Sequence, residues 1–166
     1  KNIAKFFVVL AITLALGVIP GLQTEVFAAP GDYYSPYDLA YSPNGSYIAV
    51  TDVTKGTVAI IDTATDTVAR TVALNGSPKG VAWSSGNMLY VAEYDGKNVA
   101  EIDPTDGSID RRFQTGRKPA GLAVAGNNLV VTNFGLGTLS VVDLTTGSVL
   151  GSAAVDNYPV VVTTTT

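Results

Sequence analysis

The sequence predicts an all-β protein made of repeated four-stranded antiparallel units. Prolines, aspartates and other polar residues recur at intervals of 40 to 42 residues. Short segments rich in Val, Ile, Thr and Tyr alternate with turn residues, as is typical of β-strands. Beyond the first 28 residues no window shows the 3.6-residue apolar period of a helix. Four strand-like segments fill each interval.

The first 28 residues have the layout of a secretory signal. Lys1 and Lys5 precede an apolar run at residues 6–19, and Ala28 ends a small-residue motif. This order is typical of a signal peptide, and the run is short for a membrane-spanning helix of about 20 residues. We predict a hydrophobic signal helix at 1–28 with cleavage before Ala29, then a linker at 29–34. An uncleaved anchor is the alternative, and it also places the domain outside the membrane.

Three sets of residues mark the repeat. They are Pro36, Pro78, Pro119 and Pro159; Asp62, Asp103 and Asp143; and Asp52, Glu93 and Asn133. Four antiparallel strands in a period of about 40 to 45 residues are typical of a β-propeller, in which each four-stranded sheet is one blade. The expected blades are residues 35–76, 77–116 and 117–156, with part of a fourth at 157–166, so that the propeller occupies 35–166.

The expected strands follow from the apolar segments between turns. They are 37–42, 47–52, 57–62 and 67–74; 79–84, 88–93, 98–103 and 108–115; and 120–125, 128–133, 138–143 and 148–155, with a further strand beginning at Val160. Segments such as 58–61 are apolar on both faces, which suits a strand packed between two sheets. The residues expected to be buried between blades are Ile60, Val81, Trp83, Val91, Leu122, Val124, Val131 and Val141.

The turns between the third and fourth strands have their own chemistry. Each opens with an aspartate that can accept backbone N–H bonds two residues on. The turn then needs a residue in the left-handed conformation, and Gly107 and Gly147 occupy that position. The first blade has Asp66 there. We therefore interpret these side chains as structural. The turn residues are Asp62, Asp103, Gly107, Asp143 and Gly147.

The repeated motifs carry a family resemblance. They are elements similar to Pro-x-Gly-Val-Ala at 78–82 and 119–123, to Tyr-Val-Thr-Asn at 49–52, 90–93 and 130–133, and to Val-x-Val-Ile-Asp at 58–62 and 139–143. With them, residues 34–166 resemble the YVTN-type β-propeller repeats, related to surface-layer and cytochrome d1-like propellers. The resemblance implies a fold but no activity. The first unit departs from the motif, because Asp38 stands where glycine is usual.

Three blades form an incomplete ring. Propellers typically have about four to eight blades, and an open array leaves exposed sheet edges. We therefore expect this chain to be the N-terminal fragment of a longer propeller whose remaining blades belong to the same chain. The alternative is that several copies assemble into one ring.

Composition excludes several functions. Charged residues make up 14% of the chain, against about 25% in typical domains. There is no cysteine and no histidine, which excludes a disulfide framework, a Cys/His zinc site and Ser-His-Asp catalysis in this stretch. The net charge of −4 argues against nucleic-acid binding. We expect no cofactor.

One rim carries the candidate ligand-binding residues, because the second strands of all blades end there. Three oxygen-bearing side chains stand at equivalent positions, and such oxygens suit Ca²⁺. The favoured alternative is that they accept bonds from backbone N–H groups at the strand ends. Aromatic side chains in the adjoining loops could stack on a sugar or a peptide. The candidates are Asp52, Glu93, Asn133, Tyr94, Phe134 and Lys118, with Tyr158 at the same rim.

These features favour an exported, non-catalytic binding or scaffold module in the periplasm, at the cell surface or secreted. Its partner would be a protein or a small-molecule or carbohydrate ligand. Contact with a membrane would involve only the N-terminal signal or anchor. The alternative is a propeller enzyme, either a metal-dependent lactonase or lyase or a quinoprotein-like dehydrogenase. Its catalytic residues would lie in blades outside this chain.

Overall fold

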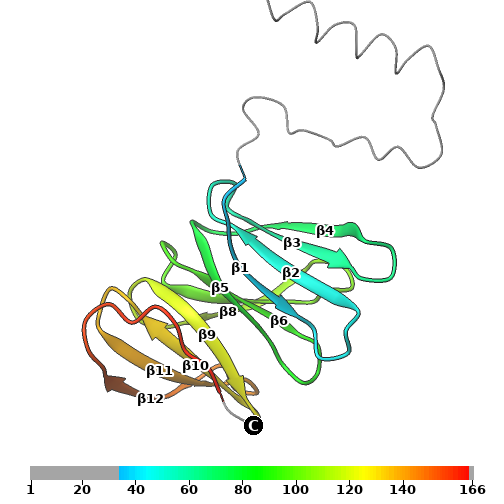
Figure 1. Cartoon of the computed structure of the whole chain (residues 1–166). Helices are drawn as coiled ribbons and strands as arrows, with labels where there is room; N and C mark the ends of the chain where they lie inside the picture. The colour runs from blue at the N-terminus through cyan, green and yellow to red at the C-terminus, as the bar shows by residue number, and fades with distance from the viewer. Residues whose placement is uncertain (1–33, 165–166) are drawn as a thin grey trace, which may run out of the picture. The chain divides into compact units, whose positions relative to one another are not determined.

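The computed structural model describes residues 34–164, which form three consecutive four-stranded antiparallel sheets (Figure 1). The predicted fold class, an incomplete array of propeller blades, is confirmed. Residues 34–164 contain no helix, and so none that could cross a membrane. The predicted signal peptide and most of the linker lie outside the described residues.

Each blade is a simple meander of four strands. Blade 1 has β1 (Pro36–Tyr41), β2 (Tyr47–Asp52), β3 (Thr57–Asp62) and β4 (Thr67–Ala73); blade 2 has β5 (Pro78–Trp83), β6 (Leu89–Glu93), β7 (Asn98–Ile102) and β8 (Ile109–Gln114); blade 3 has β9 (Pro119–Ala125), β10 (Asn128–Asn133), β11 (Thr138–Asp143) and β12 (Val149–Ala154). Every predicted bound of these strands agrees with the structure to within one residue.

The fourth unit differs from the prediction. Residues 155–164 contain no strand, although a strand was expected from Val160. The segment does lie along β9, because the Thr132 hydroxyl donates to the Val160 carbonyl at 3.3 Å and the Thr164 hydroxyl donates to the Val124 carbonyl at 3.3 Å. A strand needs a backbone ladder, and within 34–164 no second strand is present to pair with this segment.

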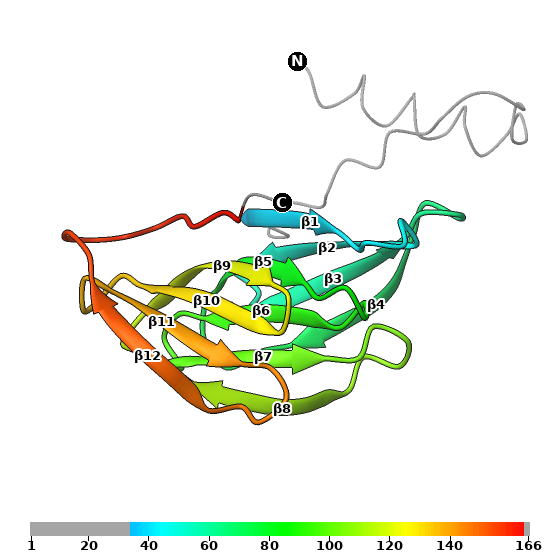
Figure 2. The ribbon, with the colours of Figure 1, turned by 90° about the horizontal axis from the view of Figure 1, so that it is seen from below.

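The first strands of successive blades lie side by side, as the adjacent β1, β5 and β9 ribbons show (Figure 2). Their approach is so close that two positions have no room for a side chain. A Cβ at Gly80 would lie 2.2 Å from the Ala120 carbonyl oxygen, and one at Gly121 would lie 2.4 Å from that of Val160. The glycine of the Pro-x-Gly motif is therefore required by the backbone of the next blade.

Blade 1 makes this approach differently, because Asp38 takes the place of glycine. The Asp38 Oδ2 atom accepts a hydrogen bond from the Val81 backbone N–H at 3.1 Å. Further along the same interface, the indole Nε1 of Trp83 donates to the Ala40 carbonyl at 3.0 Å. Blades 2 and 3 meet through the close backbone contact at Gly80, whereas blades 1 and 2 are joined at the equivalent position by the hydrogen bond to the Asp38 side chain.

Two apolar clusters form the core, one between each pair of neighbouring blades. Strand β6 contributes to both, because Leu89 and Val91 face blade 1 while Tyr90 and Ala92 face blade 3. Alternate residues of a strand point to opposite faces, so a strand between two sheets is apolar throughout. The sequence analysis used the same physics, but for segments such as 58–61 of β3 rather than for β6.

Six of the eight residues predicted to be buried are buried: Ile60, Val81, Trp83, Val91, Leu122 and Val131. Val124 and Val141 are only half-buried, which corrects the prediction. Val124 packs against the margin of the second cluster. Val142 is the residue of β11 that faces blade 2, so its neighbour Val141 points to the face that no described blade covers.

The two outer blades each present apolar side chains to solvent. On blade 1, Leu39, Tyr41 and Val68 are 60%, 63% and 58% exposed, and on blade 3 Leu150 is 61% exposed. A groove of about 590 Å³ runs over the face of blade 1, between Val50, Ile61 and Val68 among others. Large contiguous apolar patches of this kind mark surfaces that bind other protein surfaces.

We expect the full chain to self-associate through these faces. Burying one exposed Val or Leu side chain would add about 1.5–3 kcal/mol of stabilising free energy. This is large compared with a typical free energy of unfolding of about 5–15 kcal/mol. Size-exclusion chromatography with light scattering should show oligomers, and a Leu39→Lys/Val68→Lys variant should shift them toward the monomer. A monodisperse wild-type monomer with cooperative unfolding would contradict this expectation.

Candidate functional site

The candidate residues at the ends of the second strands have one role in common. Each accepts a hydrogen bond from a backbone N–H in the segment that leads into the first strand of its blade. The bonds run from Ser35 to Asp52 Oδ1 at 3.2 Å, from Asn75 to Glu93 Oε1 at 2.8 Å and from Gly116 to Asn133 Oδ1 at 2.9 Å. These side chains therefore tie the start of each blade to the end of its second strand.

Their remaining partners differ from blade to blade. The fully buried Glu93 is bound by Arg112 through two bonds, Nε to Oε2 at 2.9 Å and Nη2 to Oε1 at 3.1 Å. The Asn133 amide nitrogen donates to the hydroxyls of Thr138 and Ser140. Asp52 Oδ1 also accepts the backbone N–H groups of Thr54 and Lys55, whereas its buried Oδ2 has no hydrogen-bond partner.

A cation site at these residues stays a prediction. Among residues 34–164 no three acidic side chains are grouped so as to hold a metal ion. Arg112 already neutralises the carboxylate of Glu93, which is the candidate from blade 2.

A second buried carboxylate, Glu101, links two blades. It accepts a hydrogen bond from the Tyr90 hydroxyl at 2.7 Å and is paired with Arg111. Arg111 in turn donates to the Leu144 and Thr145 carbonyls of blade 3. Burial, followed by the bond to Glu101, raises the pKa of Tyr90 far above its usual value, so its hydroxyl stays protonated and donates.

An aromatic row lies on the rim where the second strands end. Tyr94 and Phe134 directly follow β6 and β10, and Tyr158 precedes Pro159. Ring centroids are 5.9 Å apart for Tyr94 and Phe134 and 4.9 Å apart for Phe134 and Tyr158, and both pairs are tilted, a favourable arrangement. The structure thus brings together three aromatic residues that the sequence placed only on a common rim.

Two lysines complete this group, which we call the aromatic–lysine cluster: Tyr37, Lys79, Tyr94, Lys118, Phe134 and Tyr158. The Lys79 ammonium lies 3.5 Å from the Tyr94 ring centroid, 5.2 Å from that of Tyr37 and 5.9 Å from that of Phe134. The Lys118 ammonium lies 5.2 Å from the Tyr94 centroid. These are cation–π distances, so the aromatic faces hold the two charges at the rim.

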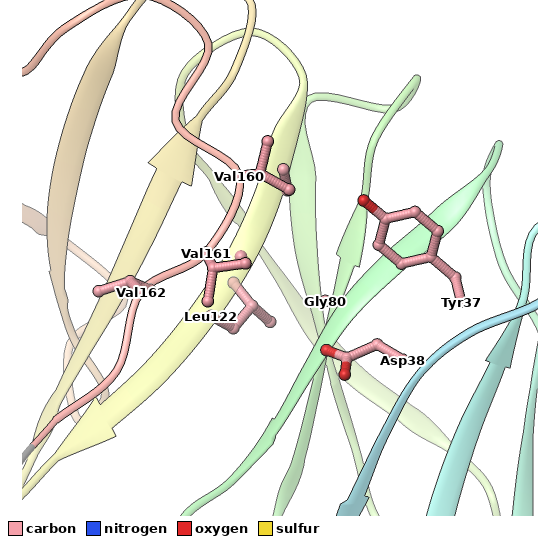
Figure 3. Close-up of a pocket in the computed structure, with 9 residues that line it drawn as sticks. Tyr37, Asp38, Gly80, Leu122, Val160, Val161 and Val162 are labelled. Atoms are coloured by element: carbon pink, nitrogen blue, oxygen red, sulfur yellow. The ribbon is translucent and has the colours of Figure 1, made fainter.

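The cluster adjoins a pocket of about 280 Å³ on the inner side of the blades (Figure 3). Tyr37 and Asp38 project from β1 on one side of the pocket, and Leu122, Val160 and Val161 lie on the other (Figure 3). Tyr37 lines the pocket and also contacts Lys79. The pocket and the cluster therefore share Tyr37.

Two cluster residues have a strained backbone. Lys118 and Tyr158 have φ angles of 55° and 60°, and each directly precedes the first proline of the next unit. Left-handed geometry costs a residue with a side chain about 1–2 kcal/mol. Lys97, Asp66 and Asn87, which lie outside the cluster, have the same geometry, so it does not distinguish the cluster.

The turn residues lie at the other ends of the third strands, away from the cluster. The Oδ1 atoms of Asp62, Asp103 and Asp143 accept the N–H groups two residues on, each at 2.8 Å. The Thr146 backbone N–H is the main cause of the lowered pKa of Asp143. Gly107 and Gly147 have φ angles of 81° and 74°, and Asp66 has 54°. Their contacts are those of turn-forming residues.

Sequence reasoning missed two residues of the cluster, Tyr37 and Lys79. Both directly follow the first proline of their blade, so they share a repeat position. That shared position was the available signal. Lys79 meets Tyr94 within blade 2, because the start of β5 pairs with the end of β6. Its approach to Tyr37 and Phe134 depends on how neighbouring blades are rotated, which no single repeat reveals.

Residues 34–164 form blades of a β-propeller. Three adjacent antiparallel meanders pack face to face, and residues from all three line one inner pocket. No model of a known protein family matches the chain, and no curated protein matches its sequence significantly. Solved structures do resemble it.

Three of these structures illustrate the likeness. Hydrazine synthase from Kuenenia stuttgartiensis has a TM-score of 0.73 at 23% identity, with 87% of this chain and 42% of that chain covered. Virginiamycin B lyase from Staphylococcus aureus has a TM-score of 0.70 at 17% identity, with 82% of this chain and 48% of that chain covered. Apo AztD from Citrobacter koseri has a TM-score of 0.66 at 18% identity, with 85% of this chain and 39% of that chain covered. This chain thus spans less than half of each, and at such identities the likeness shows the fold alone.

Proposed function

We propose that this chain is part of an exported, non-catalytic β-propeller that binds a ligand at the rim formed by the aromatic–lysine cluster. The observation that carries the proposal is the Lys79 ammonium held 3.5 Å from the Tyr94 ring, beside Phe134 and next to the inner pocket. Ligand sites typically combine a concave, mostly apolar surface with a few convergent polar groups.

The finer parts of the proposal rest on sequence motifs. The Pro-x-Gly-Val-Ala and Val-x-Val-Ile-Asp motifs support blades of the YVTN type, and the charged, apolar and small-residue order of residues 1–28 supports export. The unpaired faces of blades 1 and 3 support further blades, from the same chain or from other copies. Beyond the ligand, the only other contact that we propose is with a membrane, through the N-terminal signal or anchor.

An enzyme is the second candidate. Two similar structures are named as a lyase and a synthase, so the fold accommodates catalysts. This chain has no histidine, and a catalytic version would need acids, bases or metal ligands from blades outside it. The two candidates differ in whether a bound probe is chemically altered.

Saturation-transfer NMR tests the binding role, because it observes the probe and tolerates an oligomeric protein. The full chain is mixed separately with trigalacturonate, maltotriose and hexaglutamate. We expect at least one probe to receive saturation from the wild type, much less from a Phe134→Ala variant, and to be recovered unchanged by mass spectrometry. No transfer to any probe, or undiminished transfer with the variant, would contradict a binding role at this rim, and a cleaved probe would favour the enzyme.

A further inference from the structure

Positive charge is concentrated on the rim that carries the cluster. All four lysines of residues 34–164 lie there, namely Lys55, Lys79, Lys97 and Lys118, together with Arg117. The turns at the opposite ends of the third strands carry aspartates instead, namely Asp62, Asp66, Asp103, Asp106 and Asp143. Although the chain has a net charge of −4, one of its rims is therefore locally basic and attracts anions.

Four acidic side chains also lie on this rim, namely Asp52, Glu93, Asp95 and Asp156. Glu93 is buried and paired with Arg112. Asp95 accepts a hydrogen bond from the Ser77 hydroxyl at 2.7 Å, and Asp156 accepts the Asn157 backbone N–H at 2.7 Å. A carboxylate that accepts a hydrogen bond keeps its negative charge. With Arg112 included, six cations face these four carboxylates, so the rim has a small positive excess.

Lys79 and Lys118 are the two lysines held in the cluster. In the described part of the chain neither forms an ion pair with a carboxylate, and their recorded partners are aromatic rings. An ammonium group has three N–H donors, and a ring face attracts its charge without providing an oxygen acceptor. A ligand carboxylate would supply that acceptor, at a site where both charges lie within 5.2 Å of one ring centroid.

The aromatic row defines the rest of the ligand. An inorganic anion would contact the lysines but would leave Tyr158, which is 66% exposed, in water. A sugar ring presents C–H groups that pack on the electron-rich face of an aromatic ring. The adjoining pocket of about 280 Å³ is at the lower limit of small-molecule sites, roughly 300 Å³, so it suits a single sugar unit.

We propose that the aromatic–lysine cluster binds a saccharide that carries a carboxylate, such as a uronic acid unit. The carboxylate pairs with Lys79 and Lys118, and the sugar ring packs on the row Tyr94, Phe134 and Tyr158. An acidic peptide is less favoured, because the two ammonium groups meet at one aromatic ring, whereas successive acidic residues would need a row of cations. The inference rests on the proposed binding function and specifies its ligand.

Isothermal titration calorimetry on the full chain, in the oligomeric state in which it is purified, tests the ligand class. The probes are trigalacturonate, neutral maltotriose, hexaglutamate and inorganic phosphate. We expect trigalacturonate to bind about tenfold more tightly than maltotriose, since one charge-assisted contact is worth about that factor. Its affinity should fall as salt is added.

Three variants locate the site. Lys79→Gln and Lys118→Gln should each weaken trigalacturonate binding about tenfold while leaving maltotriose binding within twofold. Lys97→Gln is the matched control, because Lys97 lies on the same rim without contacting an aromatic ring and its replacement removes the same charge. It should change trigalacturonate affinity less than twofold. Circular dichroism confirms that each variant is folded.

The remaining outcomes separate this inference from the binding function. Equal affinity for trigalacturonate and maltotriose, or unchanged trigalacturonate binding in Lys79→Gln, would overturn the carboxylate preference while binding itself stands. Tighter binding of hexaglutamate would identify a peptide site, and phosphate as tight as trigalacturonate would identify an anion site without a sugar contact. Either result overturns the inference. Failure of all four probes would overturn the proposed function with it.

Discussion

Replacing Gly80 by alanine is expected to lower the free energy of unfolding by about 3 kcal/mol, the upper part of the range for overpacking. The added Cβ would lie 2.2 Å from the Ala120 carbonyl oxygen and 3.0 Å from the Gly121 Cα. Both are backbone atoms of β9, so relief requires the first strands of blades 2 and 3 to move apart. Gly80 does not have a positive φ, and the effect therefore comes from space alone.

Gly86→Ala is the matched control. The nearest atom to a Cβ at Gly86 is the Ser84 hydroxyl oxygen at 3.8 Å, so this change should cost less than about 0.5 kcal/mol. Urea unfolding of both variants at one fixed protein concentration provides the comparison, because self-association makes apparent stability concentration-dependent. Equal midpoints for Gly80→Ala and the wild type would show that neighbouring blades do not approach as described.

Replacing Arg112 by alanine should cost about 2–3 kcal/mol. Removing one partner of a buried ion pair typically costs about 3–5 kcal/mol, and the lower figure applies because the Arg112 side chain is 33% exposed. The variant leaves the fully buried Glu93 carboxylate without its cation, although the Asn75 backbone N–H still donates to Oε1. Urea unfolding measures the loss.

Two further variants identify the cause. Arg117→Ala removes an exposed arginine that forms no ion pair within residues 34–164, and it should change stability by less than about 0.5 kcal/mol. Adding Glu93→Gln to Arg112→Ala removes the unpaired charge and should restore part of the lost stability. If the double variant is less stable than Arg112→Ala, the buried charge is not the source of the effect.

The strands were predictable because their signals are local. Residues 47–52 and 57–62 of the first blade were bounded correctly from their content of Val, Ile, Thr and Tyr between turn residues. The turns were equally predictable, because the aspartate that opens each turn accepts a hydrogen bond from the backbone N–H only two residues further on. The exception, Val160, shows the limit of such signals, because strand formation needs a partner as well as propensity.

Part of the candidate site was predictable for the same reason. Tyr94, Phe134 and Lys118 were placed on one rim from the repeat register alone. Lys79 was not, because its contact with Tyr94 depends on the pairing of β5 with β6, and its other ring partners, Tyr37 and Phe134, belong to neighbouring blades. The predicted set of Asp52, Glu93 and Asn133 is equivalent by position, yet each side chain has its own partners.

The four-stranded repeat and its turns follow from the sequence alone, because each depends on backbone geometry within one unit. Which side chains meet across strands and blades follows only from the tertiary structure. The contacts of Glu93 with Arg112 and of Lys79 with Tyr94 depend on strand order and pairing within blade 2, whereas the approach of Lys118 to Tyr94 depends on the rotation between blades 2 and 3. Packing of all side chains at an interface sets that rotation, so no motif within a single repeat encodes it.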